Sequence, residues 1–233
     1  MGEKVAIVTA AGSGMGKAIA EKLHADGYKL ILMSKSDNAI KLADKLGQIG
    51  LSGDLTDKRD LKKIIDVAME KYARVDALIL STGHPAKGEI NELSDEQWHE
   101  GMDLVLLNVI RLIRMVTPQM IKQRSGSIVL ISSFAALEPS LDFPISSVMR
   151  SALASFVKLF CQRYAGVGLR INSVLPGFID SYAQSEETIQ SVPAKRLGKV
   201  SEVADTVSFL LTDGAAYING QNIPVDGGLS KHL

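Results

Sequence analysis

Short apolar runs alternate with longer amphipathic stretches along most of the chain. The short runs are rich in β-branched residues, which favour strands, and the longer stretches carry apolar residues at helical spacing. The predicted strands cover residues 5–8, 29–33, 77–80, 127–131 and 170–174, and the predicted helices cover residues 16–25, 39–46, 95–122, 147–164 and 203–211. Strand, helix, strand is therefore the repeating unit.

This alternation predicts the fold class. Strands that are apolar throughout must be buried on both faces, and each connecting helix must bury its own apolar stripe against the sheet. Residues 1–233 are therefore predicted to form a single α/β domain, a Rossmann-like doubly wound parallel sheet with helices on both faces. Residues 177–199 form the longest stretch without periodicity, so we expect a substrate loop there.

A glycine-rich segment directly follows the first predicted strand. It reads Thr9-Ala10-Ala11-Gly12-Ser13-Gly14-Met15-Gly16 and opens the first predicted helix. Glycine lets backbone amides approach a pyrophosphate, and a helix N-terminus supplies complementary partial charge. An ordinary strand-to-helix turn is the alternative, but the position between the first strand and the first helix favours a nucleotide-binding loop.

Net charge and cysteine count bear on the kinds of binding partner and on the cellular compartment to be expected. Lysine plus arginine and aspartate plus glutamate each number 26, so a formal net charge of zero gives no support for nucleic acid or an anionic membrane. The single cysteine, Cys161, excludes an internal disulfide and a cysteine-rich metal site, which suits the cytoplasm. Glycines interrupt the apolar start, so no signal peptide is expected, and no run reaches the ~18 apolar residues of a membrane span.

Further motifs follow the glycine-rich segment in a fixed order. They are Asp54-Leu55, Asn108, Ser133, Pro176-Gly177 after Asn172, and Asp226-Gly227-Gly228. Together with Thr9, Gly14 and Gly16 they resemble the short-chain dehydrogenase/reductase family over essentially the whole chain, in particular its 3-oxoacyl-acyl carrier protein reductases. The family's first loop glycine is Ala10 here. Its Asn-Asn-Ala-Gly motif is represented by Leu80-Ser81-Thr82-Gly83, which retains the glycine and loses both asparagines.

The resemblance implies a dinucleotide cofactor and the residues that bind it. Asp54 would hydrogen-bond the adenine, although an aspartate before a helical run also suits a helix N-cap. The implied cofactor-binding residues are Thr9, Gly12, Ser13, Gly14, Met15, Gly16, Ser34, Lys35, Asp54, Leu55, Thr82, Gly83, Arg150, Pro176, Gly177, Ile179 and Ser181.

The end of the second predicted strand bears on the choice of cofactor. An aspartate there would accept hydrogen bonds from the ribose 2′-hydroxyl and repel a 2′-phosphate. The corresponding residue is Ser34, followed by Lys35, and a hydroxyl beside an ammonium suits a phosphate better than a diol. NADP(H) is therefore favoured over NAD(H). On the alternative interpretation Lys35 is a solvated loop cation, and Asp37 accepts hydrogen bonds from the diol.

The catalytic motif of the family is altered. Family members carry a tyrosine thirteen residues after the serine that matches Ser133, and a lysine four residues later; here these positions are Ser146 and Arg150. A serine is a poorer acid than a phenol, and its oxygen falls about 4 Å short of the phenol's reach, a gap that one water can span. Arginine keeps a permanent charge and can fork onto two ribose hydroxyls, so cofactor binding can survive where proton transfer is impaired.

Other candidate residues have both functional and structural interpretations. The resemblance implies that Ser133 orients a carbonyl oxygen and that Asn108 holds a water in a proton relay; alternatively, they cap a strand end and satisfy a helix backbone gap. His84 follows a strand's carboxyl end, where open α/β sheets bind ligands, and its imidazole is a candidate for the missing acid. Tyr182, in the predicted substrate loop, is a second candidate substrate residue.

These features favour a cytoplasmic NADP(H)-preferring carbonyl reductase or alcohol dehydrogenase with an atypical proton-donor site. The alternatives are a dinucleotide-binding sensor or regulatory protein without redox turnover, and a non-redox lyase or dehydratase. A small-molecule substrate is expected, but no motif identifies it.

A homo-oligomer, either a dimer or a tetramer, is also expected. Residues 95–122 and 147–164 carry more apolar residues than one sheet-facing stripe needs, and the resemblance implies that these helices pair between subunits. The apolar residues include Leu104, Leu106, Leu107, Val109, Leu112 and Ile113.

Overall fold

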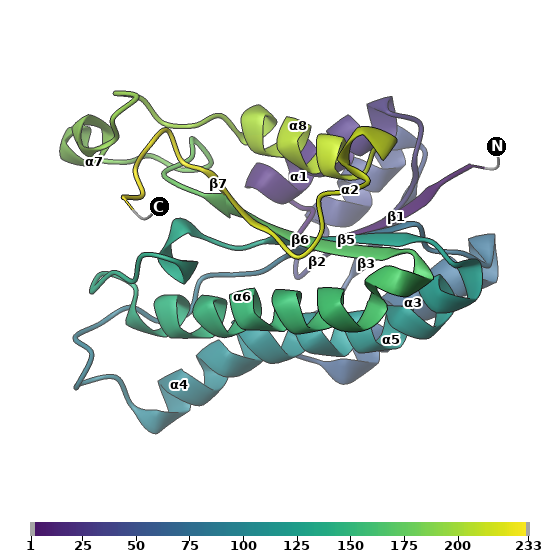
Figure 1. Ribbon diagram of the computed structural model, residues 1–233, viewed down its shortest axis with the longest axis horizontal. Coiled ribbons are helices and arrows are strands. Elements are labelled where there is room, and N and C mark those ends of the chain that lie inside the picture. The colour runs from purple at the N-terminus through teal and green to yellow at the C-terminus, as the bar shows by residue number, and fades with distance from the viewer. Residues whose placement is uncertain (1–2, 232–233) are drawn as a thin grey trace.

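The computed structural model describes residues 3–231 and contains a sheet of parallel strands between two layers of helices (Figure 1). The strands are β1 (Val5–Thr9), β2 (Lys29–Ser34), β3 (Ile49–Ser52), β4 (Ala77–Ser81), β5 (Gly126–Ile131), β6 (Leu169–Pro176) and β7 (Asn222–Val225). Their order is β3-β2-β1-β4-β5-β6-β7. The predicted doubly wound parallel α/β fold is therefore confirmed.

Helices cover both faces of this sheet. The α-helices are α1 (Gly14–Ala25), α2 (Asn38–Leu46), α3 (Lys58–Tyr72), α4 (Asp95–Gly101), α5 (Asn108–Gln123), α6 (Pro144–Tyr164), α7 (Glu186–Ser191) and α8 (Val200–Leu210). A π-helical turn, η1 (Met102–Leu107), joins α4 to α5, and short 3₁₀ turns are η2 (Phe134–Ala136), η3 (Ala165–Val167) and η4 (Asp213–Ala215).

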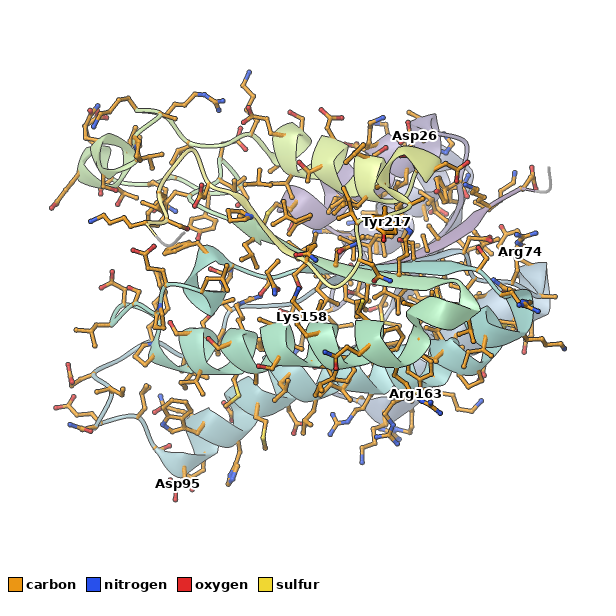
Figure 2. All side chains as sticks on the ribbon, in the orientation of Figure 1. Asp26, Arg74, Asp95, Lys158, Arg163 and Tyr217 are labelled. Carbon is orange, nitrogen blue, oxygen red and sulfur yellow. The ribbon has the colours of Figure 1, made fainter. Side chains whose placement is uncertain are left out.

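Two apolar cores hold the layers together, one on each face of the sheet. One core packs β-strand residues against α1, α2 and α8, and the other packs them against α3, α5 and α6 (Figure 1). In the first layer α1 and α8 lie side by side, and Asp26, just after α1, accepts a hydrogen bond from Ser208 of α8 at 2.6 Å (Figure 2). The near-continuous apolar strands thus have the two-sided burial that a parallel sheet requires.

Apart from the 3₁₀ turns, four elements lie outside the strand and helix ranges predicted above, and one of them, α7, lies in the stretch predicted to be a loop. β3 is short and only partly buried, and β7 is a four-residue edge strand that contains Pro224. Neither gives the continuous apolar run by which a central strand is found, and proline is tolerated at a sheet edge. The remaining element, α3, is rich in charged residues but carries the buried stripe Leu61, Ile64, Ile65 and Ala68.

The helix predicted over residues 95–122 is a continuous helical segment, Asp95–Gln123, that is long and apolar enough to cross a membrane. The apolar residues on its sheet-facing side pack in the core of the chain. Val109, Leu112 and Ile113 are each about 1% exposed there. The prediction that these three residues face another subunit is therefore wrong, because the chain's own sheet and helices cover the α5 stripe that they form.

The carboxyl ends of the strands gather at one end of the molecule, on the left in Figure 1, where α4 and α7 also lie. The strand order reverses between β1 and β4, which are neighbours in the sheet although β2 follows β1 in sequence. Loops that leave two such strands diverge to opposite faces and open a crevice. The crevice at the ends of β1 and β4 is thus where a ligand is expected.

Candidate active site

The loop between β1 and α1 forms a cradle for a phosphate group. Ser13 is the N-cap of α1 in an extended conformation, and its hydroxyl makes no capping hydrogen bond. The first turn of α1 directs backbone N–H groups along the helix axis toward the loop, where they complement negative charge. The free hydroxyl of Ser13 and these N–H groups fit the pyrophosphate of a dinucleotide.

Glycine is favoured at one position of this loop and sterically required at another. Gly14 has a φ of +51°, in the left-handed region that glycine tolerates best. At Gly16 a Cβ would overlap the carbonyl oxygen of Ala10, so glycine allows α1 to pack closely on the loop. Ala10, which stands where the family has a glycine, also has a left-handed φ, of 51°. An alanine therefore adopts here a backbone conformation that glycine tolerates more readily.

Thr9 has a structural place at the end of β1. Its Oγ1 donates to the carbonyl oxygen of Ser81 at 2.8 Å and accepts from the Ser81 backbone N–H at 3.0 Å. The side chain is buried and joins the ends of β1 and β4. Of the residues implied to bind cofactor, Thr9 thus contributes by fixing the crevice.

At the end of β2, Ser34 and Lys35 have different surroundings. The hydroxyl of Ser34 donates to the carbonyl oxygen of Ser36 at 2.7 Å and accepts from the backbone N–H of Ala39 at 3.0 Å. The Lys35 side chain is 86% exposed, and its Nζ lies 2.9 Å from a carboxylate oxygen of Asp54. Lys35 is therefore the solvent-accessible cation at this corner, while Ser34 shapes the turn that presents it.

Asp54 carries a negative charge across the ordinary pH range. Its hydrogen bond to Lys35 and two further hydrogen bonds from Thr56 lower the pKa of its carboxyl to about 2. The alternative role of Asp54 as a helix N-cap is wrong. The N-cap of α3 is Asp57, whose carboxylate accepts from the backbone N–H of Arg59 at 2.8 Å. The carboxylate of Asp54 faces a cavity instead.

That cavity, which we call the Lys35 cavity, has a volume of about 560 Å³. Its walls come from the ends of β1, β2, β3 and β4 and from the start of the long helix. They are formed by Ala10, Ser34, Lys35, Gly53, Asp54, Leu55, Thr56, Gly83, Glu100, Asp103 and Leu104. Several residues implied to bind the adenosine half of a dinucleotide are thereby brought together.

The segment after β6 lies over the phosphate loop. Gly177 follows the last residue of β6 and donates its N–H to the carbonyl oxygen of Val225 at 3.1 Å. The Cβ of Ser181 lies 3.3 Å from where a Cβ on Gly14 would be. Ile179 is buried between these two points and pairs with Gly198. Residues 177–181 therefore touch the loop that would hold the pyrophosphate.

A second cavity, which we call the Ser146 cavity, lies beside the segment after β6 and has a volume of about 70 Å³. It unites catalytic, cofactor and substrate candidates from five parts of the sequence. The lining residues are Met15, His84, Ser132, Ser133, Phe134, Phe143, Ser146, Arg150, Pro176, Gly177, Phe178, Ile179, Ser181 and Tyr182.

Arg150 and Ser146 form a hydrogen-bonded pair on the first turns of α6. Because they are four residues apart, both side chains emerge on the same face of the helix. The Nε of Arg150 donates to the Ser146 hydroxyl oxygen at 3.0 Å, and its Nη1 donates to the Ile131 carbonyl oxygen at 3.3 Å. The Nη2 lies 3.5 Å from the hydroxyl of Thr82. A hydroxyl that accepts from a guanidinium keeps its own proton free to donate to another group.

The guanidinium of Arg150 is almost fully buried, with 3% of the residue exposed. Burial lowers the pKa of Arg150 to about 10, which still leaves it charged at neutral pH. Among the ion pairs of the described residues, none includes Arg150. A buried cation without a carboxylate partner lowers the stability of the fold. Its presence therefore indicates that Arg150 binds a ligand rather than that it stabilises the protein.

Ser133 and Asn108 each make a structural hydrogen bond and each keep a further donor or acceptor unused. Ser133 caps η2 by accepting from the backbone N–H of Ala135 at 3.2 Å, and its own hydroxyl proton remains available in the Ser146 cavity. The Nδ2 of Asn108 donates to the Leu104 carbonyl oxygen at 2.5 Å, at the point where η1 passes into α5. Its buried Oδ1 has no hydrogen-bond partner among the described residues.

His84 and Tyr182, which are far apart in sequence, both line the Ser146 cavity, and because both residues are exposed they mark its mouth. Their rings are edge-to-face with centroids 6.1 Å apart. Desolvation lowers the pKa of His84, and the positive charges of Arg150 and Lys87 lower it further. The imidazole is therefore neutral at pH 7, which leaves little protonated His84 to act as an acid at that pH.

The aromatic wall of this cavity was missed by the sequence analysis. Phe134 and Phe178 have ring centroids 5.7 Å apart, and Phe143 lies just before α6. The Nζ of Lys87 is 4.7 Å from the centroid of the Phe143 ring. Scattered phenylalanines and a loop lysine carry no spacing signal, so only the fold reveals that they share one site.

Comparison with known proteins gives matches over nearly the whole chain. Residues 9–230 match the family described as enoyl-(acyl carrier protein) reductase. The 3-oxoacyl-[acyl-carrier-protein] reductase FabG of Escherichia coli (strain K12) is 33% identical over 236 residues, with 97% of each chain covered. Dehydrogenase/reductase SDR family member 4 of Oryctolagus cuniculus is 30% identical over 249 residues, with 100% of this chain and 96% of the relative covered.

Two solved structures share the whole fold. YwfH, an NADPH-dependent reductase involved in bacilysin biosynthesis, matches with a TM-score of 0.95 and 27% identity, and all of both chains is covered. L-sorbose reductase from Gluconobacter frateurii, solved with NADPH and L-sorbose, matches with a TM-score of 0.91 and 25% identity over 99% of this chain and 98% of the other.

Proposed function

The chain belongs to the short-chain dehydrogenase/reductase family, and we propose that it is an NADP(H)-dependent carbonyl reductase in which Ser146 and Arg150 stand in for the family's tyrosine and lysine. Its relatives over the full length are reductases, so the protein is an oxidoreductase that acts on CH–OH or carbonyl groups with a nicotinamide cofactor. The alternatives without redox chemistry are accordingly set aside.

The hydrogen bond from Arg150 to Ser146 is the observation that carries this proposal. It joins a permanent cation to a hydroxyl inside the cavity that also contains Ser133. In the family motif the lysine lowers the pKa of the tyrosine and binds the ribose of the cofactor. Arg150 has the charge and the number of donors for both tasks, because its guanidinium contacts Ser146 through Nε and retains other N–H groups.

The two serines of the Ser146 cavity would bind the carbonyl oxygen of the substrate. Ser133 donates its hydroxyl proton to orient that oxygen, and Ser146 donates the proton that neutralises it, directly or through one water. Arg150 supports Ser146 because a hydroxyl that accepts a hydrogen bond from a cation becomes a better donor. The free Oδ1 of Asn108 is a suitable acceptor for a water that resupplies the proton.

NADPH, when bound, supplies the hydride for reduction. The phosphate loop with Ser13, Gly14 and Gly16 would hold its pyrophosphate, and the Lys35 cavity would receive its adenosine half. The fit is supported by the left-handed φ of Gly14 and by the close packing that glycine allows at position 16.

Lys35 is the residue that we propose to select NADP(H). YwfH is described as NADPH-dependent, and the sorbose reductase was solved with NADPH, in agreement with a preference for NADP(H) here. Lys35 now pairs with Asp54, but both side chains are accessible and their ion pair is worth little in water. A 2′-phosphate beside Ser34 would draw the ammonium away from Asp54.

Lys35→Ala is expected to weaken NADPH binding by about five- to tenfold and to leave NADH binding unchanged, because one exposed charge-assisted hydrogen bond to the 2′-phosphate is lost. Dissociation constants for both cofactors, measured by fluorescence titration, provide the test. Lys45→Ala removes the same charge at the far end of α2 and is the matched control. An equal loss of affinity for both cofactors would contradict the proposed role of Lys35.

We further propose that residues 177–199 form the substrate loop of a single domain. The loop includes Tyr182 at the mouth of the Ser146 cavity and the short helix α7. It begins at the end of β6, approaches the phosphate loop at Ser181 and ends at α8, so its position depends on both the cofactor site and the first helical layer. The cytoplasm remains the proposed compartment, in keeping with the one free cysteine, Cys161.

A homo-oligomer is also proposed, on the two stretches predicted to pair, residues 95–122 and 147–164, through exposed residues that the sequence analysis did not name. An apolar groove of about 590 Å³ lies between α5 and α6, on the layer where Arg163 is labelled in Figure 2. Leu159 is 65% exposed on one side of the groove, and Ile121 is exposed on the other. Exposed apolar residues flanked by arginines are typical of subunit interfaces.

Leu159→Glu is expected to shift the protein from an oligomer to a monomer of 25.1 kDa, because a buried glutamate would face the same residue or another apolar surface of the partner subunit. Light scattering at micromolar concentration measures the change. Ile90→Glu, at an exposed position outside the groove, is the control. A wild-type mass of one chain would show that this groove is not an interface under those conditions.

The function itself is tested by NADPH consumption with a panel of aldehydes and ketones. We expect stoichiometric loss of nicotinamide absorbance, accompanied by formation of the corresponding alcohol. Tight NADPH binding without turnover on any carbonyl or enone of the panel would contradict the proposed activity.

Reduction of a conjugated carbon–carbon double bond is a second candidate activity. The family that residues 9–230 match is described as enoyl-(acyl carrier protein) reductase, and the proposed donor, Ser146, is a weak acid. Hydride addition to the β-carbon of an enone leaves negative charge on the carbonyl oxygen, while the proton is added at the α-carbon and can come from water. Hydrogen bonds from Ser146 and Ser133 suffice for that charge. An enone that yields a saturated ketone rather than an allylic alcohol would favour this activity.

A further inference from the structure

The Ser146 cavity is positively charged and lacks an acidic residue. Among its lining residues Arg150 carries a full charge and His84 is titratable, whereas no aspartate or glutamate contributes to the wall. The other arginines without an ion pair in the described chain are exposed or only partly buried, whereas Arg150 is 3% exposed; they are Arg114, Arg124, Arg163 and Arg170. What distinguishes this cavity is therefore an arginine that is both buried and without a carboxylate partner.

Lys87, which is not itself a lining residue, adds a second cation beside the wall of the same cavity. Its Nζ lies over the ring of Phe143, 4.7 Å from the centroid, and Phe143 lines the cavity. Lys87 is exposed, and none of the ion pairs of the described residues includes it. It is also close enough to His84 to lower the pKa of that imidazole, as Arg150 does.

The cofactor does not supply the missing negative charge. Its phosphates belong at the loop between β1 and α1, whereas the ribose and nicotinamide that would lie near Arg150 carry no negative charge. A positive potential between low-dielectric aromatic walls is strengthened, because such walls focus the field. Because Arg150 is assigned to Ser146 and the ribose, Lys87 is the cation beside this cavity that remains for an anion arriving with the substrate.

We propose that the carbonyl substrate is a carboxylic acid, whose carboxylate binds Lys87 at the mouth of the Ser146 cavity while its apolar or aromatic body contacts Phe143 and Tyr182. This proposal rests on the proposed function, because it takes the Ser146 cavity as the place where the substrate is bound. It extends that function by naming the class of substrate.

A carboxylate suits this site better than a phosphate. Phosphate groups in proteins are usually held by several donors together, such as a helix N-terminus or a cluster of arginines. The mouth of the cavity offers one lysine ammonium and one neutral imidazole beside aromatic rings. Lysine as a point charge and an aromatic surface together match an arylcarboxylate or another apolar acid.

The affinities of 2-naphthoate and 2-naphthamide for the NADPH-loaded protein are compared, because the two probes share one ring system and differ in the charge of the carboxylate. Naphthoate is expected to bind at least about fivefold more tightly than the amide, and raising the salt from about 20 to about 300 mM should weaken naphthoate alone. Lys87→Gln should remove most of the preference and leave naphthamide affinity unchanged. Lys63→Gln, which removes an exposed lysine charge on α3, is the matched control.

The proposal is overturned if naphthoate binds no more tightly than naphthamide, if Lys87→Gln does not change the preference, or if 2-naphthyl phosphate binds more tightly than naphthoate in a Lys87-dependent manner. These binding results do not depend on turnover. Absence of NADPH oxidation with preserved naphthoate selectivity would therefore count against the proposed activity and leave the substrate class standing. Reduction of neutral ketones without any preference for naphthoate would support the proposed activity and count against the proposed substrate class.

Discussion

Arg150→Met is expected to lower kcat/KM for NADPH-dependent reduction by about 10²- to 10³-fold and to raise the dissociation constant of NADPH. The substitution keeps much of the buried volume but removes charge-assisted hydrogen bonds to the ribose, each worth roughly 1.5–3 kcal/mol, together with the donor to Ser146. Steady-state kinetics with NADPH titrations measure both effects.

Arg150→Lys is the matched control for this prediction. A lysine retains the positive charge but lacks the planar fork, so it should keep more cofactor affinity than methionine while losing part of the contact with Ser146. Thermal unfolding without cofactor verifies that each variant is folded. Wild-type NADPH affinity in a folded Arg150→Met protein would contradict the assignment of Arg150 to the cofactor.

Ser146→Ala is expected to reduce kcat by about 10²- to 10⁴-fold and to leave the dissociation constant of NADPH within about twofold of the wild-type value, because the variant loses a proton donor but keeps Arg150. Ser147→Ala is the control. Ser147 is also buried on α6, but its hydroxyl contacts the backbone of Ser140 rather than the cavity. Full activity of Ser146→Ala would rule out Ser146 as the donor.

The pH dependence separates Ser146 from His84 as the source of the proton. Since partial desolvation and the charges of Arg150 and Lys87 hold the pKa of His84 below its ordinary value, a rate that depends on protonated His84 should fall about tenfold for each pH unit above that pKa. Neither the Ser146 hydroxyl nor Arg150, with a pKa of about 10, titrates between pH 6.5 and about pH 9. A flat kcat profile in this range is therefore expected.

The sheet could be predicted from the sequence because its central strands, such as β1, β4 and β5, are apolar throughout and separated by helices. That pattern follows from burial on both faces and needs no knowledge of distant contacts. No ranges for the edge strands β3 and β7 could be predicted, because half-exposed or proline-containing strands carry only a weak hydrophobic pattern. The structure therefore adds the two edges of the sheet.

The candidate site was partly predictable because its motifs follow strand ends. The phosphate loop, Ser133 and Arg150 each stand at a recognisable position in sequence, and the fold brings the last two into one cavity. Lys87 and Phe143 could not be found this way, because they come from loops whose paths depend on tertiary contacts. Whether Asp54 or Asp57 is the N-cap of α3 likewise depends on where the helix begins.

The most direct test of the central claim is a double-mutant cycle on kcat for Ser146 and Arg150. If the two side chains act as one proton-donating unit, the Ser146→Ala/Arg150→Met protein saturated with NADPH should have nearly the same kcat as the slower single variant, since either change disables the unit. Multiplicative losses in the double variant would show that the two residues act independently and would contradict the claim.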